Sequence, residues 1–278
     1  MTCPRIEVDL NKIRQNTRCL VDRLKSRGID VTGVTKAVCG HPKIAQAMLD
    51  GGVVDLADAR ISNVRRVRQA GLTCQVGMIR GPMLSQAGQI PQSCDTSFNT
   101  EMTVIAALAA ASIRTGKPHG IILMVEMGDM REGILPQHVP AFAQAVAGME
   151  GVELWGIAAN YACLSGVRPS DQTMRSFSDL ATTVEKECGP FMGLVSGGNS
   201  ANLSWALGPE PIERINNLRL GEAILLGIDP ISGEQIGGLY TDAFTIIAEV
   251  IETKTKPDHV SMAHPEPAMG ELRIVPEY

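Results

Sequence analysis

The sequence has few of the features that mark nucleic-acid-binding, membrane or secreted proteins. Aromatic residues make up 4% of its 278 residues, and its 25 Lys and Arg are scattered, so no basic stripe is available for nucleic acid. The longest apolar runs, 105–113 and 119–127, are far shorter than the roughly 20 residues that cross a bilayer. The first 16 residues lack the apolar stretch of a signal peptide. We therefore expect a cytoplasmic protein with neither nucleic acid nor membrane as a partner.

Patterned cysteine, histidine and glycine motifs are also missing. There is no CxxC pair, no HExxH and no close His/Cys cluster, so we expect no metal site. No GxGxxG follows the first strand candidate, which argues against a dinucleotide-binding sheet. An odd, dispersed set of cysteines in a chain of this length favours reduced thiols over a disulfide framework. The seven are Cys3, Cys19, Cys39, Cys74, Cys94, Cys163 and Cys188.

Short β-type runs alternate with helical stretches along most of the chain. The strand candidates are 6–10, 30–36, 53–59, 74–80, 95–99, 120–127, 153–160, 192–198 and 217–224. This alternation indicates an α/β protein with a parallel sheet. Without the first strand, eight βα units run from Val31 to about Leu226 and predict a (β/α)8 barrel of the TIM type. An open, doubly wound sheet is the alternative.

The pattern changes after residue 228. The segment 240–257 is typical of one long strand without a helix behind it, and the segment 260–278 is Pro-rich and irregular. We expect a barrel domain over 11–228 and a β-type domain formed by 1–10 with 229–278. About fifty residues are too few for much core of their own.

The carboxyl ends of the barrel strands are where active sites form on this fold. Charged or polar residues lie at six of these predicted ends: Lys36, Arg80, the loop 128–133, Asn160, the run 196–200 and Arg219. Lys36 ends a strand that looks buried on both faces, so it raises a specific question. It either extends its amine to solvent or serves as a Schiff-base lysine that burial keeps neutral and nucleophilic.

Two glycine-containing segments are suited to binding an anion. In SGGNSANL (196–203) paired glycines let the backbone approach a ligand, and Ser and Asn precede a helical stretch with free N–H groups. The alternative interpretation of these residues is an ordinary strand–loop–helix turn with an N-cap serine. RLGEAILLG (219–227) adds a second such segment, and its Arg219 suits an anion or a ring nitrogen better than a core.

Two further features keep two interpretations open. In the loop GDMREG, Asp129 and Arg131 either form a weak surface ion pair or face a ligand. Asn160 is either a strand-end amide with its hydrogen bonds satisfied or a ligand contact.

Taken together, six stretches resemble the alanine racemase superfamily, the pyridoxal 5'-phosphate enzymes built on a (β/α)8 barrel. The match is closest to its alanine/ornithine racemase-like branch. The order and spacing of the motifs carry this resemblance from about residue 4 to residue 255. The stretches are PRIEVDLNKIRQN, VTGVTKAVCG, LADARISN, LMVEMGDMREGI, VSGGNSANL and INNLRLGEAILLG.

The resemblance implies a role for each site residue. Lys36 would form the Schiff base with the cofactor and act as the base on one face of the substrate carbon. Arg219 would hydrogen-bond the pyridine nitrogen and keep it unprotonated, which suits proton exchange better than transamination. Arg131 would lie near the phenolic oxygen, and Asn160 would stand where alanine racemases keep a histidine. The phosphate-binding set would comprise Ser196, Gly197, Asn199, Ser200, Gly221 and Glu222, the last two through their backbone.

The sequence departs from alanine racemases at several positions. Asn160 replaces the histidine, and Cys39 and Gly40 stand where a tyrosine is expected; both changes fit the ornithine-like branch. In the superfamily a tyrosine from the partner subunit's C-terminal domain is the second base, which implies a homodimer. The tyrosines here are Tyr161, Tyr240 and Tyr278, and none lies in a recognisable copy of that motif.

Three functions follow from this resemblance. The first is an amino acid racemase that interconverts the L- and D-forms of a small or basic amino acid, with the second base unidentified. The second is a cofactor-homeostasis protein that binds pyridoxal phosphate without turnover, which the short C-terminal part favours and the β-type segment at 240–252 opposes. The third is an aldolase acting on a β-hydroxy amino acid, which needs a metal and a His/Asp pair that the C-terminal part does not show.

Overall fold

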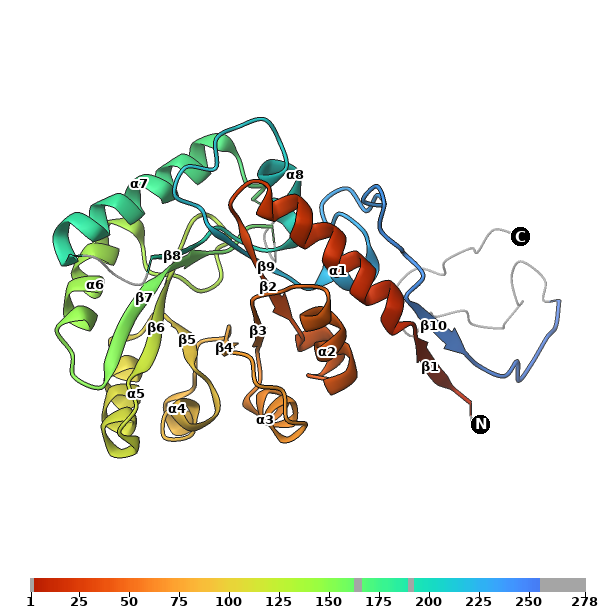
Figure 1. Cartoon of the computed structure of the whole chain (residues 1–278), viewed down its shortest axis with the longest axis horizontal. Helices are drawn as coiled ribbons and strands as arrows, with labels where there is room; N and C mark the ends of the chain where they lie inside the picture. Colours follow the sequence, from red (N-terminus) through yellow and green to blue (C-terminus); the bar gives the residue numbers. More distant parts are fainter. Residues whose placement is uncertain (1–2, 163–166, 190–192, 256–278) are drawn as a thin grey trace, which may run out of the picture. The chain divides into compact units, whose positions relative to one another are not determined.

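The core of the protein is a closed barrel of eight parallel strands (Figure 1). A computed structural model describes residues 3–162, 167–189 and 193–255. Neighbouring strands follow one another in chain order, and the last strand pairs with the first through Val31 and Leu218. The predicted (β/α)8 barrel is confirmed, and the open sheet is wrong. The strands are β2 (Asp30–Val34), β3 (Asp55–Asp58), β4 (Val76–Met78), β5 (Thr96–Asn99), β6 (His119–Val125), β7 (Val152–Ala159), β8 (Leu194–Ser196) and β9 (Asn217–Leu220).

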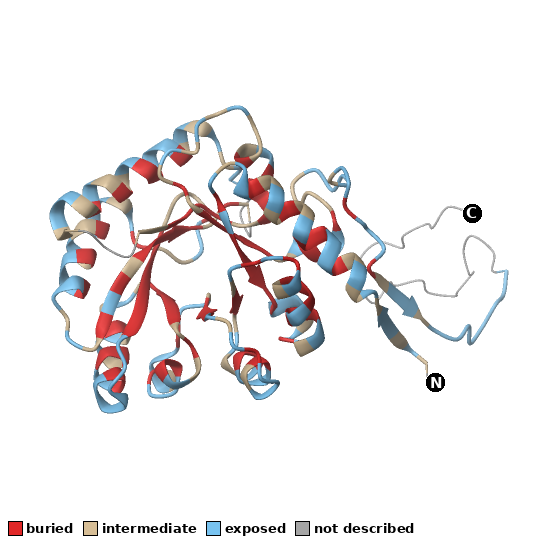
Figure 2. Cartoon of the chain, viewed as in Figure 1, coloured by how far each residue is buried: buried red, intermediate tan, exposed pale blue. Residues whose placement is uncertain are grey.

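Helices surround the barrel and turn their apolar faces inward (Figure 2). Helix α1 shows the reason, because Ile13, Leu20 and Leu24 fall on one side of it and are fully buried. Its first turn is capped by Asp9, whose carboxylate accepts from the backbone N–H of Asn11 at 2.9 Å. The helices are α1 (Leu10–Lys25), α2 (Pro42–Asp50), α3 (Ile61–Gln69), α4 (Ile90–Ser93), α5 (Met102–Thr115), α6 (Val139–Ala147), α7 (Asp171–Cys188), α8 (Leu203–Ala206) and α9 (Glu222–Leu226).

The seam between β8 and β9 is the shortest strand pairing of the barrel. One pair of Cα partners, Ser196 and Asn217, defines its register. The side chain of Asn216 extends it by imitating a backbone: its Oδ1 accepts from Val195 N at 2.9 Å, and its Nδ2 donates to Gly193 O at 2.5 Å. Side-chain hydrogen bonds therefore help to close the barrel at this point.

The chain divides into a large compact unit, Val8–Phe244, and a small unit formed by Met1–Glu7 with Thr245–Tyr278. Strands β1 (Arg5–Val8) and β10 (Phe244–Ile247) pair in a two-stranded sheet. The domain boundaries at 10/11 and 228/229 stay predictions.

The long strand predicted over 240–257 is wrong in length, because β10 has four residues and 248–255 form no strand. Val250 and Ile251 are exposed, and a strand that pairs on one side only without burying its apolar side chains is marginal in water. The Pro-rich segment 260–278 lies outside the described residues. None of the helices in the described ranges is long and apolar enough to cross a membrane.

Candidate active site

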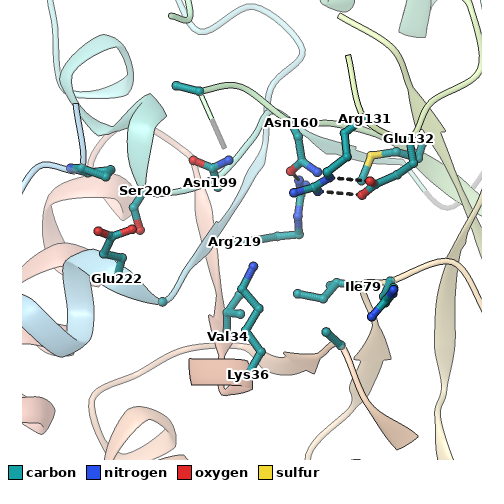
Figure 3. Close-up of a pocket in the computed structure, with 16 residues that line it drawn as sticks. Val34, Lys36, Ile79, Arg131, Glu132, Asn160, Asn199, Ser200, Arg219 and Glu222 are labelled. Carbon is teal, nitrogen blue, oxygen red and sulfur yellow. Dashed lines mark hydrogen bonds and ion pairs between the residues drawn. The ribbon is translucent and has the colours of Figure 1, made fainter. Parts of the chain in front are cut away.

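A cavity of about 480 Å³ opens at the carboxyl ends of the barrel strands, within the size range of sites for small molecules (Figure 3). Eight of the ten residues predicted to hold a cofactor line it. They are Lys36, Arg131, Asn160, Asn199, Ser200, Arg219, Gly221 and Glu222. Arg80, also expected at a strand end, and Glu132, which sequence reasoning did not single out, line the same cavity.

Lys36 follows β2 and begins the 3-10 turn η1 (Lys36–Val38), with its side chain extending into the cavity toward Arg219 (Figure 3). The residue is exposed, which agrees with the alternative of an amine that extends to solvent: the strand ends at Val34, and Lys36 lies beyond it. Its place is set by the residue before it, since Thr35 Oγ1 donates to Asp58 Oδ2 at 2.7 Å. An anchored strand end therefore presents the Lys36 amine to the cavity.

Asp58 anchors two strand ends beside Lys36 and was not foreseen from the sequence. Its carboxylate is fully buried. Besides Thr35 it accepts from Arg60 N at 3.0 Å and from Asn63 Nδ2 at 2.9 Å. The strand LADAR, which shows an acid directly after two buried residues, held the signal that could have found it.

Arg219 is a buried cation at the floor of the cavity, 4% exposed. Its Nη1 donates to Ser196 Oγ at 2.6 Å, and its Nη2 donates to Asn160 Oδ1 at 2.6 Å and to Ala159 O at 2.7 Å. The guanidinium carbon stands 5.2 Å from the centre of the Phe98 ring. These contacts fix the plane of the guanidinium at the floor of the cavity.

Ser196 and Gly197 do not line the cavity, unlike the other eight residues predicted to contact the cofactor. Ser196 is fully buried and lies behind Arg219, to which it offers its hydroxyl oxygen. The strand residue before the loop thus points into the barrel, and Asn199 and Ser200 beyond it reach the cavity.

The wall opposite Arg131 is formed by two loops that present Asn199, Ser200, Gly221 and Glu222. Asn199 closes its turn on itself, with its Oδ1 accepting from Ala201 N at 2.9 Å. Ser200 Oγ accepts from Ala223 N at 3.2 Å, which ties the two loops together. A Cβ on Gly221 would lie 3.1 Å from Val34 O, so glycine lets this loop rest on the strand that leads to Lys36.

The loop 126–133 after β6 presents Arg131 and Glu132 to the cavity (Figure 3). The guanidinium of Arg131 binds the Glu132 carboxylate through both Nε and Nη2. Asp129 Oδ2 lies 3.9 Å from Arg131 Nε, so the two residues form the expected ion pair, but the Asp129 carboxylate is buried rather than at the surface, and Arg131 also lines the cavity.

Glu126 holds this loop in shape from within. Its Oε1 accepts from Gly128 N at 2.6 Å and from Met130 N at 3.1 Å. The two ends of the loop are joined by a hydrogen bond from Glu126 N to Ile134 O at 3.0 Å. The Glu126 carboxylate and this backbone hydrogen bond therefore hold the two ends of the loop together.

The tyrosines of the described chain lie away from the cavity. Tyr161 is fully buried in the core, and burial raises the pKa of its hydroxyl above the ordinary value. Tyr240 is largely exposed and lies near Lys12, and Tyr278 falls outside the described residues, as does Cys163. Within the described ranges, no group of three His, Cys, Asp or Glu residues is arranged to hold a metal.

The cavity thus combines a primary amine, a fixed guanidinium and two backbone loops suited to an anion. A family model described as the N-terminal domain of alanine racemase matches residues 8–230. The chain belongs to the alanine racemase family. The membership predicted from the sequence motifs is confirmed.

Two curated members of the family match nearly the whole chain. A lysine racemase of Thermotoga maritima is 33% identical over 257 residues, which cover 92% of this chain and 72% of the relative. An ornithine racemase of Acetoanaerobium sticklandii is 32% identical over 256 residues, which cover 91% of this chain and 72% of the relative. The predicted relationship to amino acid racemases is confirmed.

Solved structures of the family share the fold. The alanine racemase of the D-cycloserine producer Streptomyces lavendulae superposes with a TM-score of 0.70 at 23% identity over 83% of this chain. The matched region spans 60% of that structure. At this identity the likeness supports the barrel architecture alone.

Proposed function

We propose that this protein is a pyridoxal-phosphate-dependent amino acid racemase that acts on basic amino acids. The observation that carries the proposal is the convergence of the Lys36 amine and the Arg219 guanidinium with an anion-binding wall in one cavity. Membership in the alanine racemase family supports the reaction. The names of its relatives, a lysine and an ornithine racemase, support the substrate class.

The donors around the cavity fit each part of pyridoxal phosphate. The Lys36 amine suits its aldehyde, and the Arg219 guanidinium suits its ring nitrogen. Ser200 and the backbone of Gly221 and Glu222 suit its phosphate. Ser196, expected from the sequence to hold the phosphate, here supports Arg219 instead. When bound, the cofactor supplies an electron sink for the charge left as the α-proton departs.

The protein's residues then divide the work of proton transfer. Lys36 removes or returns the α-proton on one face of the substrate carbon. Arg219, which is always protonated, would donate to the ring nitrogen of a bound cofactor and would leave that nitrogen without a proton. Such a contact would favour return of the proton over transfer of the amino group. Arg131, held by Glu132, lies where it can orient the substrate carboxylate or the phenolic oxygen.

The opposite face of the substrate carbon needs a second acid or base. We propose that it comes from a partner subunit of a homodimer, because the described tyrosines lie away from the cavity. A cytoplasmic location agrees with the six described cysteines, all of which are free thiols. Sedimentation velocity that shows a monomer alone at working concentration would contradict the dimer.

Replacement of Lys36 tests the proposed function. The purified protein is expected to form D-lysine or D-ornithine from the L-form, measured by chiral chromatography, and Lys36→Ala is expected to lower the rate at least a thousandfold because the proton-transfer group is lost. Borohydride treatment of the wild-type holoenzyme is expected to attach a pyridoxyl group to the peptide that contains Lys36. The exposed Lys43 in α2 supplies the matched control, Lys43→Ala, which should retain full activity. Labelling elsewhere, or activity that persists in Lys36→Ala, contradicts the assignment.

A second candidate function, cofactor binding without turnover, is favoured by the lack of a tyrosine at the cavity in the described chain. Incubation with L-amino acids in deuterated water separates the two. Exchange of the α-proton together with D-product supports the racemase. Exchange without D-product indicates a single working base, and cofactor binding without exchange indicates the carrier.

A further inference from the structure

Behind Arg219, a line of hydrogen bonds crosses the barrel interior over three neighbouring strands. Arg219 Nη1 donates to Ser196 Oγ at 2.6 Å. Ser196 Oγ donates in turn to Asn217 Oδ1 at 2.5 Å, and Asn217 Nδ2 donates to Thr32 Oγ1 at 2.9 Å. The Thr32 hydroxyl is the last member of the line. These residues come from β8, β9 and β2, which lie side by side in the sheet.

All of these hydrogen bonds point the same way. A guanidinium only donates, so the Arg219 end sets the direction of the three neutral groups that follow it. The Ser196 hydroxyl accepts from Arg219 and has one proton, which it gives to Asn217. The Asn217 amide offers its oxygen to Ser196 and its nitrogen to Thr32, and a flipped amide would break both bonds.

The line is shielded from water. Arg219, Ser196, Asn217 and Thr32 are each at most 6% exposed. In such surroundings, hydrogen bonds are stronger than in water and reinforce one another along a chain, while an unpaired buried group is costly. The position of each member therefore depends on the next.

The orientation of Arg219 rests on this line on one side. Its two terminal nitrogens carry four N–H groups, and they engage Ser196 O, Ser196 Oγ, Ala159 O and Asn160 Oδ1. Ser196 supplies half of these acceptors. Its hydroxyl is aimed by Asn217, and Asn217 is aimed by Thr32.

We propose that Asn217 and Thr32 are positioning residues for the cofactor-facing arginine, acting through the Ser196 hydroxyl. Neither residue lines the cavity. They set the plane of the guanidinium, and hence its contact with the ring nitrogen, from inside the barrel. This inference rests on the proposed function, because it assumes that pyridoxal phosphate occupies the cavity.

Thr32→Val tests the inference, since valine keeps the shape of threonine and removes the hydroxyl. Its matched control is Thr17→Val: Thr17 is fully buried in α1, and its hydroxyl donates to Ile13 O at 2.7 Å, remote from this line. Two quantities are measured on holoenzyme and reconstituted apoenzyme. One is the dissociation constant of pyridoxal phosphate without substrate. The other is the number of racemisation turnovers per half-transamination, in which the amino group passes from the amino acid to the cofactor and yields an oxo acid and pyridoxamine phosphate.

Thr32→Val is expected to weaken cofactor binding about fivefold and to raise the share of half-transamination, since a loosened guanidinium no longer holds the ring nitrogen unprotonated. Thr17→Val is expected to change neither quantity by more than about twofold, whatever its loss in melting temperature. Asn217→Ala and Ser196→Ala, combined in a double-mutant cycle on the cofactor dissociation constant, are expected to be non-additive because they act through one another.

The inference would be overturned if Thr32→Val and Thr17→Val gave equal dissociation constants and equal turnover ratios, or if the effects in the double-mutant cycle were additive. Either result would show that the line of hydrogen bonds contributes to stability alone. That result leaves the proposed function intact, because wild-type binding and racemisation remain. If pyridoxal phosphate does not bind to the wild-type protein, the proposed function fails, and the inference fails with it.

Discussion

Two titratable residues in the barrel, the half-buried Asp55 and the buried His119, respond to pH in opposite directions. Burial raises the pKa of Asp55 to about 6, with the charge of Asp30 adding to the rise and a hydrogen bond from Thr32 opposing it. Burial lowers the pKa of His119 to about 4, and its ring nitrogen Nε2 lies 2.8 Å from Ser97 Oγ. The folded state therefore favours the neutral form of both side chains.

The signs of their contributions to stability are opposite. The Asp55 pKa lies above its ordinary value of 3.8, so the free energy of unfolding falls as pH rises from about 4 to about 6, by up to about 3 kcal/mol. The His119 pKa lies below its ordinary value of 6.5, so the free energy of unfolding falls as pH drops from about 6.5 to about 4. In the wild-type protein the two slopes offset each other.

Asp55→Asn is expected to separate the pH dependence of stability due to His119 from that due to Asp55. Asparagine cannot ionise but still accepts the hydrogen bond from Thr32, so the variant should be about 1–3 kcal/mol more stable than wild type at pH 7. It should also lose stability steeply between pH 6.5 and pH 4, because the His119 slope is no longer offset. Urea unfolding across this pH range measures both effects. An unchanged slope would show that the carboxyl of Asp55 ionises as it does in the unfolded chain.

Eight of the predicted site residues reach the cavity because strand ends are visible in the sequence as a change from apolar to polar letters. Ser196 and Gly197 show the limit of this reasoning. Alternate residues of a strand face opposite sides, so an error of one residue in a strand end moves a side chain from the cavity into the barrel. The partners of Arg219 could not be predicted either, because they depend on which strands become neighbours in the closed barrel.

At the scale of elements, the loop 126–133 shows how backbone closure presents a side chain. The hydrogen bonds that Glu126 accepts and the join between Glu126 N and Ile134 O hold Arg131 at the cavity. Gly133 lies at the point of closest approach. A Cβ on it would lie 2.4 Å from Glu126 N, which is closer than any real contact.

Gly133→Ala is therefore expected to force the loop open and displace Arg131. We expect a fall in kcat/KM of at least tenfold, about 1.4 kcal/mol in transition-state stabilisation, with a modest change in global stability. Steady-state racemisation and thermal unfolding measure the two quantities. Gly88→Ala is the control, because Gly88 is exposed with open space around its Cα. Equal activity of the two variants would show that the loop adjusts without cost.

The elements at the C-terminal end were the least predictable from the sequence. The alternation of FTIIAEVIE suits a long strand, yet β10 spans Phe244–Ile247 alone. Alternating apolar and polar residues form a stable strand when other residues pack against the apolar side. The sequence alone does not show whether such residues are present here. The barrel strands were predictable because helices that follow in the chain cover each of them.

At the scale of the whole molecule, we expect the stability of the closed barrel to depend on its shortest strand pairing. The pairing of β8 with β9 relies on the side chain of Asn216, which bonds Val195 N and Gly193 O. The sequence predicted the number of strands and their order. It could not predict that the side chain of Asn216 makes two of the hydrogen bonds that join β8 to β9.

Asn216→Ala is expected to lower the free energy of unfolding by about 2 kcal/mol, because two hydrogen bonds are lost and partly buried backbone groups are left unpaired. Asn216→Asp keeps the acceptor for Val195 N but turns a carboxylate oxygen toward Gly193 O, where two acceptors repel each other, so its loss should be at least as large. Urea unfolding at pH 7 orders the three proteins. A wild-type value for Asn216→Ala would show that the backbone alone closes the seam.

The hydrogen bond between Asn217 and Thr32 joins residues 185 positions apart, on the last and first strands of the barrel. A chain emerging from the ribosome therefore exposes Lys36 long before it contains the residues that set Arg219. Until β9 docks, that lysine is an ordinary amine that any aldehyde can reach. Retention of the proposed cofactor thus begins when β9 closes the barrel, and a chain that ends before β9 has the Lys36 amine but lacks Arg219.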